Sequence, residues 1–133
     1  MRLETEDGPA VEEPTGEQIR EALSGLTGRA DSFAILTRRD RPLEYLQTAG
    51  ENHQFVVEYH EGRNHCRAEA DVLPLEKVAA LFEAYNRGDE AWRDMAAWQD
   101  VTKETSGSAW VKVLILAAAL ALVAAILYVS FTR

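Results

Sequence analysis

One run limits what this chain can fold into: 17 consecutive apolar residues at positions 113–129. With its flanks the stretch covers residues 109–131, interrupted only by Lys112 and Ser130. At about 1.5 Å per residue, such a helix would span about 34 Å, slightly more than the ~30 Å hydrocarbon core of a bilayer. A small domain can hardly surround so long an apolar helix. We therefore expect residues 109–131 to form a transmembrane helix in a lipid bilayer.

The flanks of this run carry residue types that favour the membrane interface. Trp110 lies at one end, and Tyr128 and Phe131 lie at the other, where aromatic rings prefer the headgroup region. Lys112 is close enough to the start to extend its ammonium group back to the interface. These four residues are the predicted interface contacts.

Small residues repeat within the run. Ala117, Ala121 and Ala125 follow one another at four-residue spacing, which places them on one helix face. Small side chains allow close approach of a second helix in a membrane, so this face is a candidate packing surface for other transmembrane subunits. The alternative is that alanine is simply frequent in such helices.

The remaining sequence indicates how the helix is oriented. The first residues are acidic and contain proline, which is unlike a secretory signal peptide. We expect a tail-anchored, single-pass protein of the cell inner (cytoplasmic) membrane, with its N-terminal domain in the cytoplasm. Lys103 and Lys112 on the domain side favour this orientation, whereas Arg133 opposes it.

Residues 1–108 are strongly acidic, because they hold all 22 Asp and Glu but only 12 of the 14 Lys and Arg, a net charge of −10. This balance excludes nucleic-acid binding through overall positive charge. Residues 1–14 have few large apolar side chains and are predicted to be a flexible acidic arm. Residues 15–101 are predicted to form a cytoplasmic domain, and residues 102–108 a polar linker.

The domain pattern predicts an α+β fold. A capping box at Thr15 and an apolar stripe predict a first helix, and a second stripe after Pro74 predicts another, closed by Gly88. Segments 32–37, 43–50, 55–60 and 65–70 are predicted strands, and residues 89–101 fit either a helix or a turn with a fifth strand, which we favour. The expected architecture is a small antiparallel sheet of four or five strands with two helices on one face, plus the C-terminal transmembrane helix.

The last predicted hairpin also has a predicted register. A four-residue loop places His60 opposite His65, and therefore Glu58 opposite Arg67 and Tyr59 opposite Cys66. This register makes one face apolar and the other mostly charged.

Few residues offer chemistry. His60 and His65 share a face, but the register puts Cys66 on the other face, and the third candidate ligand, His53, falls in a predicted loop, so we predict no metal site. The sequence contains no nucleophile motif, glycine-rich phosphate loop or zinc-protease motif. We predict no catalytic residues, no cofactor and no enzyme activity. A single cysteine fits a reducing compartment.

Arg38, Arg39 and Arg41 form a local basic group. Near a membrane it could contact anionic headgroups or a partner, each charge contributing about 1 kcal/mol. The alternative is a solvated turn between two strands.

Residues 32–98 resemble small domains of the immunity-protein superfamily of bacterial polymorphic toxin systems. The resemblance lies in FAIL, EYLQTAG and FVVEYHEG, followed by LPLEKVAALFEAYNRGDEAW. It implies a bacterial, non-enzymatic module that binds and neutralises a toxin. The expected function is nevertheless an accessory or assembly subunit of a membrane protein complex whose cytoplasmic partner is unknown, with the immunity protein as the alternative.

Overall fold

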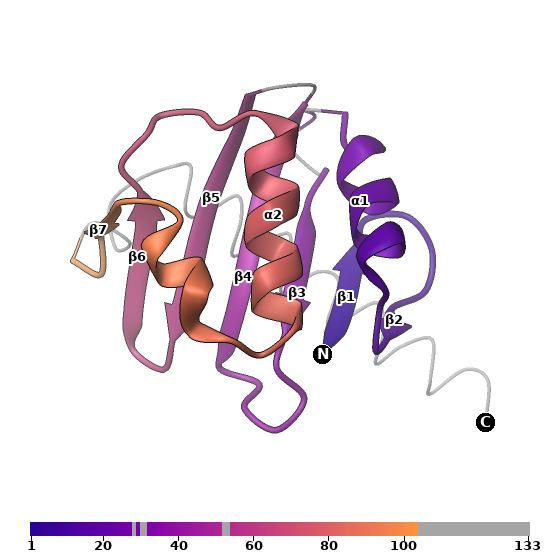
Figure 1. Cartoon of the computed structure of the whole chain (residues 1–133), viewed down its shortest axis with the longest axis horizontal. Helices are drawn as coiled ribbons and strands as arrows, with labels where there is room; N and C mark the ends of the chain where they lie inside the picture. Colours follow the sequence, from indigo (N-terminus) through magenta and orange to yellow (C-terminus); the bar gives the residue numbers. More distant parts are fainter. Residues whose placement is uncertain (28, 30–31, 52–53, 104–133) are drawn as a thin grey trace.

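The alternating segments of the sequence assemble into one antiparallel sheet in the computed structural model, which describes residues 1–27, 29, 32–51 and 54–103. Its seven strands lie in the order β2-β1-β3-β4-β5-β6-β7. Two α-helices and a short 3-10 helix, η1, lie over one face of the sheet (Figure 1). The elements are β1 (Arg2–Thr5), β2 (Val11–Glu12), α1 (Gly16–Ser24), β3 (Ala34–Thr37), β4 (Glu44–Glu51), β5 (Gln54–Glu61), β6 (Asn64–Ala68), α2 (Leu75–Asn86), η1 (Glu90–Asp94) and β7 (Trp98–Asp100).

The predicted fold class is confirmed, but the predicted number of strands is wrong. The sheet has seven strands where four or five were expected, because the N-terminal residues add β1 and β2. The segment 89–101 forms the 3-10 helix η1 and then β7, so the predicted last strand is present, but a short helix stands where the favoured interpretation had a turn.

The prediction of a flexible acidic arm over residues 1–14 is wrong. β1 pairs with β3 over four residues, and Leu3 is buried in the core. The acidic residues do not prevent this pairing because basic groups compensate them: Arg39 lies within 3.5 Å of both Glu12 and Glu13. The folded domain therefore includes the first residues of the chain.

The two helices begin and end for local reasons. The Thr15 hydroxyl accepts a hydrogen bond from the Gln18 amide at 3.2 Å, and the Gln18 side chain accepts one from the Thr15 amide at 2.9 Å, which confirms the capping box. Pro74 precedes α2, which ends before Gly88, a residue with φ of +78°.

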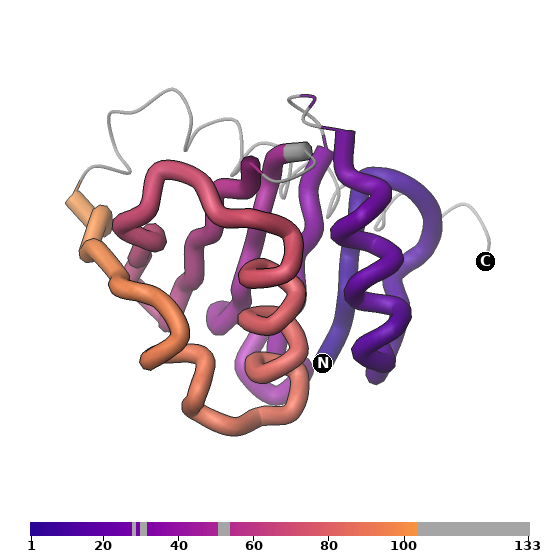
Figure 2. Tube along the Cα trace, turned by 45° about the horizontal axis from the view of Figure 1, so that its top comes forward, coloured from indigo at the N-terminus to yellow at the C-terminus, as the bar shows by residue number. Residues whose placement is uncertain are grey.

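The core lies between the sheet and the helices. Its buried apolar side chains include Ile19 and Leu23 of α1, Leu36, Leu46 and Val57 of the central strands, Leu81, Phe82 and Tyr85 of α2, and Trp92 of η1. Figure 2 shows α1 and α2 side by side above the strands that they cover. A salt bridge from Arg20 to Glu76, at 2.9 Å, joins the two helices at the surface.

Among residues 1–27, 29, 32–51 and 54–103, no helix has both the length and the apolar character that crossing a membrane requires. The predicted transmembrane helix over residues 109–131 lies outside the described residues. The same holds for residues 104–108 of the predicted linker and for all predicted membrane residues, namely Trp110, Lys112, Ala117, Ala121, Ala125, Tyr128 and Phe131.

Candidate functional site

The hairpin of β5 and β6 has the predicted register, and it gathers polar side chains on the sheet face away from the helices. Glu58 pairs with Arg67, and His60 with His65. Glu58 is 1% exposed, and its Oε1 accepts a hydrogen bond from Arg67 Nε at 2.8 Å. Its Oε2 accepts one from Gln47 Nε2 at 3.0 Å and lies 2.7 Å from His65 Nε2. A carboxylate can only accept, so this geometry assigns the proton to His65 Nε2.

These contacts set the charge state of the cluster. Burial raises the pKa of Glu58, but the hydrogen bonds from His65 and Arg67 outweigh it and hold the pKa below its usual range. Burial, and then the charge of His65, lower the pKa of His60 to about 4. Glu58 is therefore a carboxylate and His60 a neutral imidazole near neutral pH.

Glu58, His60 and His65 are residues of the types that bind metal ions, and their ligand atoms lie within 4.8 Å of one another. Their orientation disfavours metal binding. The two imidazole rings are stacked, with centroids 3.9 Å apart and planes 23° apart, so their in-plane lone pairs lie in two nearly parallel planes. Both oxygens of Glu58 already accept hydrogen bonds. Gln47, Glu58, His65 and Arg67 form a buried hydrogen-bond network, whereas His60 Nε2 and His65 Nδ1 are buried without a hydrogen-bond partner among the described residues.

The predicted register places Glu58 on the same face as the two histidines, but the hydrogen bond between Glu58 and His65 was not predicted. The signal was available, since a carboxylate two positions before His60 on a strand shares its face. Cys66, by contrast, lies opposite Tyr59 on the other face, as predicted, and is buried.

The low pKa of His60 predicts a loss of stability in acid. The unfolded histidine, with its ordinary pKa near 6.5, takes up a proton as the pH falls towards 4, whereas the folded one stays neutral. Between pH 7 and pH 4.5 this costs about 2 kcal/mol of unfolding free energy after allowance for partial exposure. Urea denaturation of His60→Leu should show a pH dependence smaller than that of the wild type by that amount. An equal dependence in His60→Leu would contradict the assignment.

The three arginines predicted to contact headgroups or a partner lie between β3 and β4, and carboxylates compensate them. Arg38 lies 3.5 Å from Glu44, and its guanidinium carbon is 4.9 Å from the centre of the Tyr85 ring. Arg39 contacts Glu12 and Glu13, and Arg41 contacts Glu44. Arg38 is only 16% exposed, so Arg39 and Arg41 are the two that can reach a surface. Their predicted role stays a prediction.

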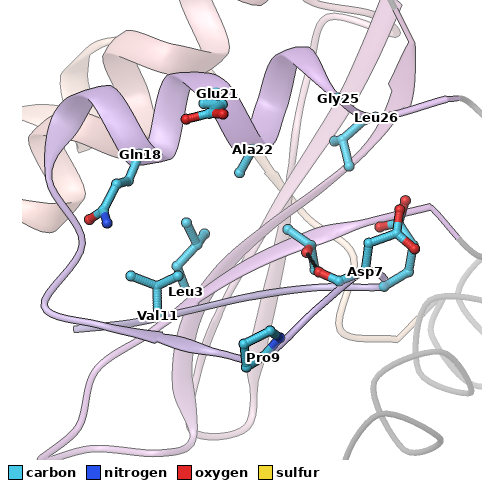
Figure 3. Close-up of a pocket in the computed structure, with 11 residues that line it drawn as sticks. Leu3, Asp7, Pro9, Val11, Gln18, Glu21, Ala22, Gly25 and Leu26 are labelled. Atoms are coloured by element: carbon cyan, nitrogen blue, oxygen red, sulfur yellow. Dashed lines mark hydrogen bonds between the residues drawn. The ribbon is translucent and has the colours of Figure 1, made fainter.

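A pocket of about 360 Å³ lies between α1 and the segment that joins β1 to β2. Figure 3 shows Leu3 and Val11 on one side and Gln18, Glu21 and Ala22 of the helix on the other. We call it the acidic pocket, and it is lined by Leu3, Thr5, Glu6, Asp7, Pro9, Val11, Gln18, Glu21, Ala22, Gly25 and Leu26. Three carboxylates and no lysine or arginine are among these residues.

The three carboxylates differ in what they contact. Glu6 is used within the fold, because its oxygens accept hydrogen bonds from the Ser32 hydroxyl at 2.7 Å and the Phe33 amide at 3.0 Å. Asp7 and Glu21 are exposed and take part in no ion pair among the described residues. They leave negative charge at the pocket that the domain does not compensate. The pocket was not predicted from the sequence, because residues 1–14 were expected to form an arm without a fixed position.

No protein-family model matches the chain, and neither does a curated protein or a solved structure. The resemblance of residues 32–98 to immunity-protein domains therefore stays a prediction. Function has to be inferred from the residues themselves.

Proposed function

We propose that the chain is a single-pass membrane protein whose α+β domain is a non-catalytic binding module, serving as an accessory or assembly subunit of a membrane protein complex. One observation carries the proposal: the apolar run at 113–129 begins ten residues after Lys103, the last described residue of a domain with its own core. Ten residues reach at most about 35 Å, so such an anchor would hold the domain close to the bilayer.

The polar groups of the domain favour binding over catalysis. The carboxylate of Glu58 is hydrogen-bonded to three groups, on Gln47, His65 and Arg67. Because its pKa is lowered, Glu58 is deprotonated near neutral pH, so it cannot donate a proton and is a weak base. The acidic pocket, in contrast, presents charge to solvent that nothing in it neutralises. A surface of this kind suits recognition, as small-molecule and protein sites combine an apolar wall with a few polar groups.

The side of the membrane follows from charge in this proposal. Lys103 and Lys112 lie between the domain and the apolar run, and lysine and arginine favour the cytoplasmic side. The cytoplasmic face of the inner membrane is therefore the proposed location of the domain. The alanine face formed by Ala117, Ala121 and Ala125 is the proposed contact with other transmembrane subunits.

Introducing two charged residues into the apolar run tests whether it anchors the protein in the membrane. The wild-type protein is expected in the membrane fraction, resistant to alkaline carbonate and released by detergent. Leu120→Arg combined with Val123→Arg should move most of it to the soluble fraction, because each central arginine costs about 2.5–3.5 kcal/mol in a transmembrane helix.

The matched control replaces the same two residues with isoleucine and should stay in the membrane fraction. A wild-type chain that washes off with carbonate, or an arginine variant that stays, would contradict the anchor. If the soluble domain alone protects cells from a toxin, the immunity-protein alternative gains support instead.

A further inference from the structure

We propose that the acidic pocket receives a cationic side chain, an arginine or a lysine, from a protein partner of the domain. The inference rests on the proposed function, since it names the chemistry of the partner that the binding module recognises. It uses Asp7 and Glu21 as the charged contacts and the β1–β2 side of the pocket as the apolar wall.

The pocket has the shape and composition that such a side chain needs. Leu3 and Val11 provide an apolar surface beneath the helix, with Ala22 facing them (Figure 3). Arginine and lysine bury their aliphatic stems along apolar surfaces while their charged ends remain beside polar groups. A wholly apolar side chain would leave the carboxylates without a partner.

The charge of the pocket is left uncompensated, as is that of exposed Glu17 on the same helix, but at the pocket two such carboxylates line one hollow. Glu44 and Glu76 each contact an arginine of the same domain, but Asp7 and Glu21 have no such contact among the described residues. The carboxyl end of α1 adds to this charge, because Gly25 and Leu26 line the pocket and the last turn of the helix has no basic residue. Helix carboxyl ends carry partial negative charge, which favours cations there.

Other occupants fit less well. Anionic headgroups and phosphates would be repelled by Asp7 and Glu21. A metal ion would need several converging oxygens, but both oxygens of Glu6 accept hydrogen bonds from Ser32 and Phe33. The favoured cation is therefore a long side chain that can contact both the apolar wall and the rim.

The test uses the full chain in non-ionic detergent micelles and follows its backbone amides by NMR. The probe is N-acetyl-arginine methylamide, and the matched control probe is the citrulline analogue, which has nearly the same shape and no charge. Arginine should cause saturable shifts at the amides of Asp7, Glu21 and Leu26, and citrulline should cause none. Raising the salt from about 20 to 200 mM should weaken binding several-fold.

Variants locate the contact. Asp7→Asn combined with Glu21→Gln should weaken binding of the arginine probe at least tenfold. Glu17→Gln combined with Glu69→Gln removes two exposed charges outside the pocket and should leave the affinity within twofold. The proposal is overturned if arginine causes no saturable shift, if citrulline causes the same shifts, or if both double variants weaken binding equally. None of these outcomes changes membrane partition, so this proposal and the anchor fail separately.

Discussion

Replacing Glu58 with glutamine is expected to lower the free energy of unfolding by about 3 kcal/mol. The change removes a buried negative charge from beside Arg67, and losing one partner of a buried pair typically costs 3–5 kcal/mol. Arg67 is 29% exposed, so water compensates it in part. Glutamine also brings an NH₂ group to an oxygen position that now faces Gln47 and His65, both of them donors. Urea denaturation at pH 7 measures the loss.

The control for this prediction is Glu69→Gln, on the same side of the domain but exposed. It should change the unfolding free energy by less than about 0.5 kcal/mol, as surface substitutions usually do. If Glu58→Gln also costs less than 1 kcal/mol, the Glu58 network contributes little to stability and is not the buried cluster described above.

Replacing Trp92 with alanine should cost about 4 kcal/mol, because truncating a buried aromatic residue removes its burial and leaves a cavity. Trp92 has no exposed surface, and its ring contacts Tyr59, Tyr85 and Trp98 edge-on, at centroid distances of 4.9, 5.3 and 5.7 Å. The Arg93 guanidinium carbon lies 4.5 Å from the ring centre. This cluster joins η1 to β5, α2 and β7, so its loss should loosen that edge of the domain. Thermal unfolding followed by circular dichroism measures the effect.

Trp92→Phe serves as the comparison and should cost less than half as much. The indole Nε1 is buried and has no hydrogen-bond partner in the described part of the chain, so phenylalanine gives up no hydrogen bond. Equal losses in the two variants would show that the cavity is not what determines the cost.

Local patterns predicted much of this fold. The register of the β5–β6 hairpin followed from loop length and from the alternation around His60 and His65. The start of α1 followed from Thr15 and its neighbours alone. These features depend on residues close together in the chain, where spacing determines geometry.

The N-terminal strands could not be predicted in the same way. Their pairing is long-range: Leu3 lies opposite Leu36, and the charges near Glu12 are compensated by Arg39. Taken alone, an acidic segment with one leucine looks unable to bury enough surface to become ordered. It becomes a strand because another part of the chain supplies both the apolar partner and the positive charge.

The candidate site was missed for the same reason. Asp7 belongs to the segment that was predicted to be a flexible arm, and Glu21 lies on the exposed face of a predicted helix. In both settings acidic residues usually serve solubility. Only the pairing of β1 with β3 places Asp7 across from α1, and only then does a pocket exist between them. The predicted transmembrane helix, which lies outside the described residues, differs in kind, because its prediction depends on the length of an apolar run and on no tertiary contact.

The position of β1 inside the sheet also limits where the protein can be shortened. A truncation starting at residue 15 would remove β1 and β2 and leave β3, with its sequence AILT, as an unprotected edge. The native edges are two and three residues long, too short to template pairing with another chain. A trimmed domain would instead expose an apolar strand together with the core surface that Leu3 covers. Such a fragment is prone to aggregate, and fragments for crystallisation or interaction assays should therefore begin at the first residue.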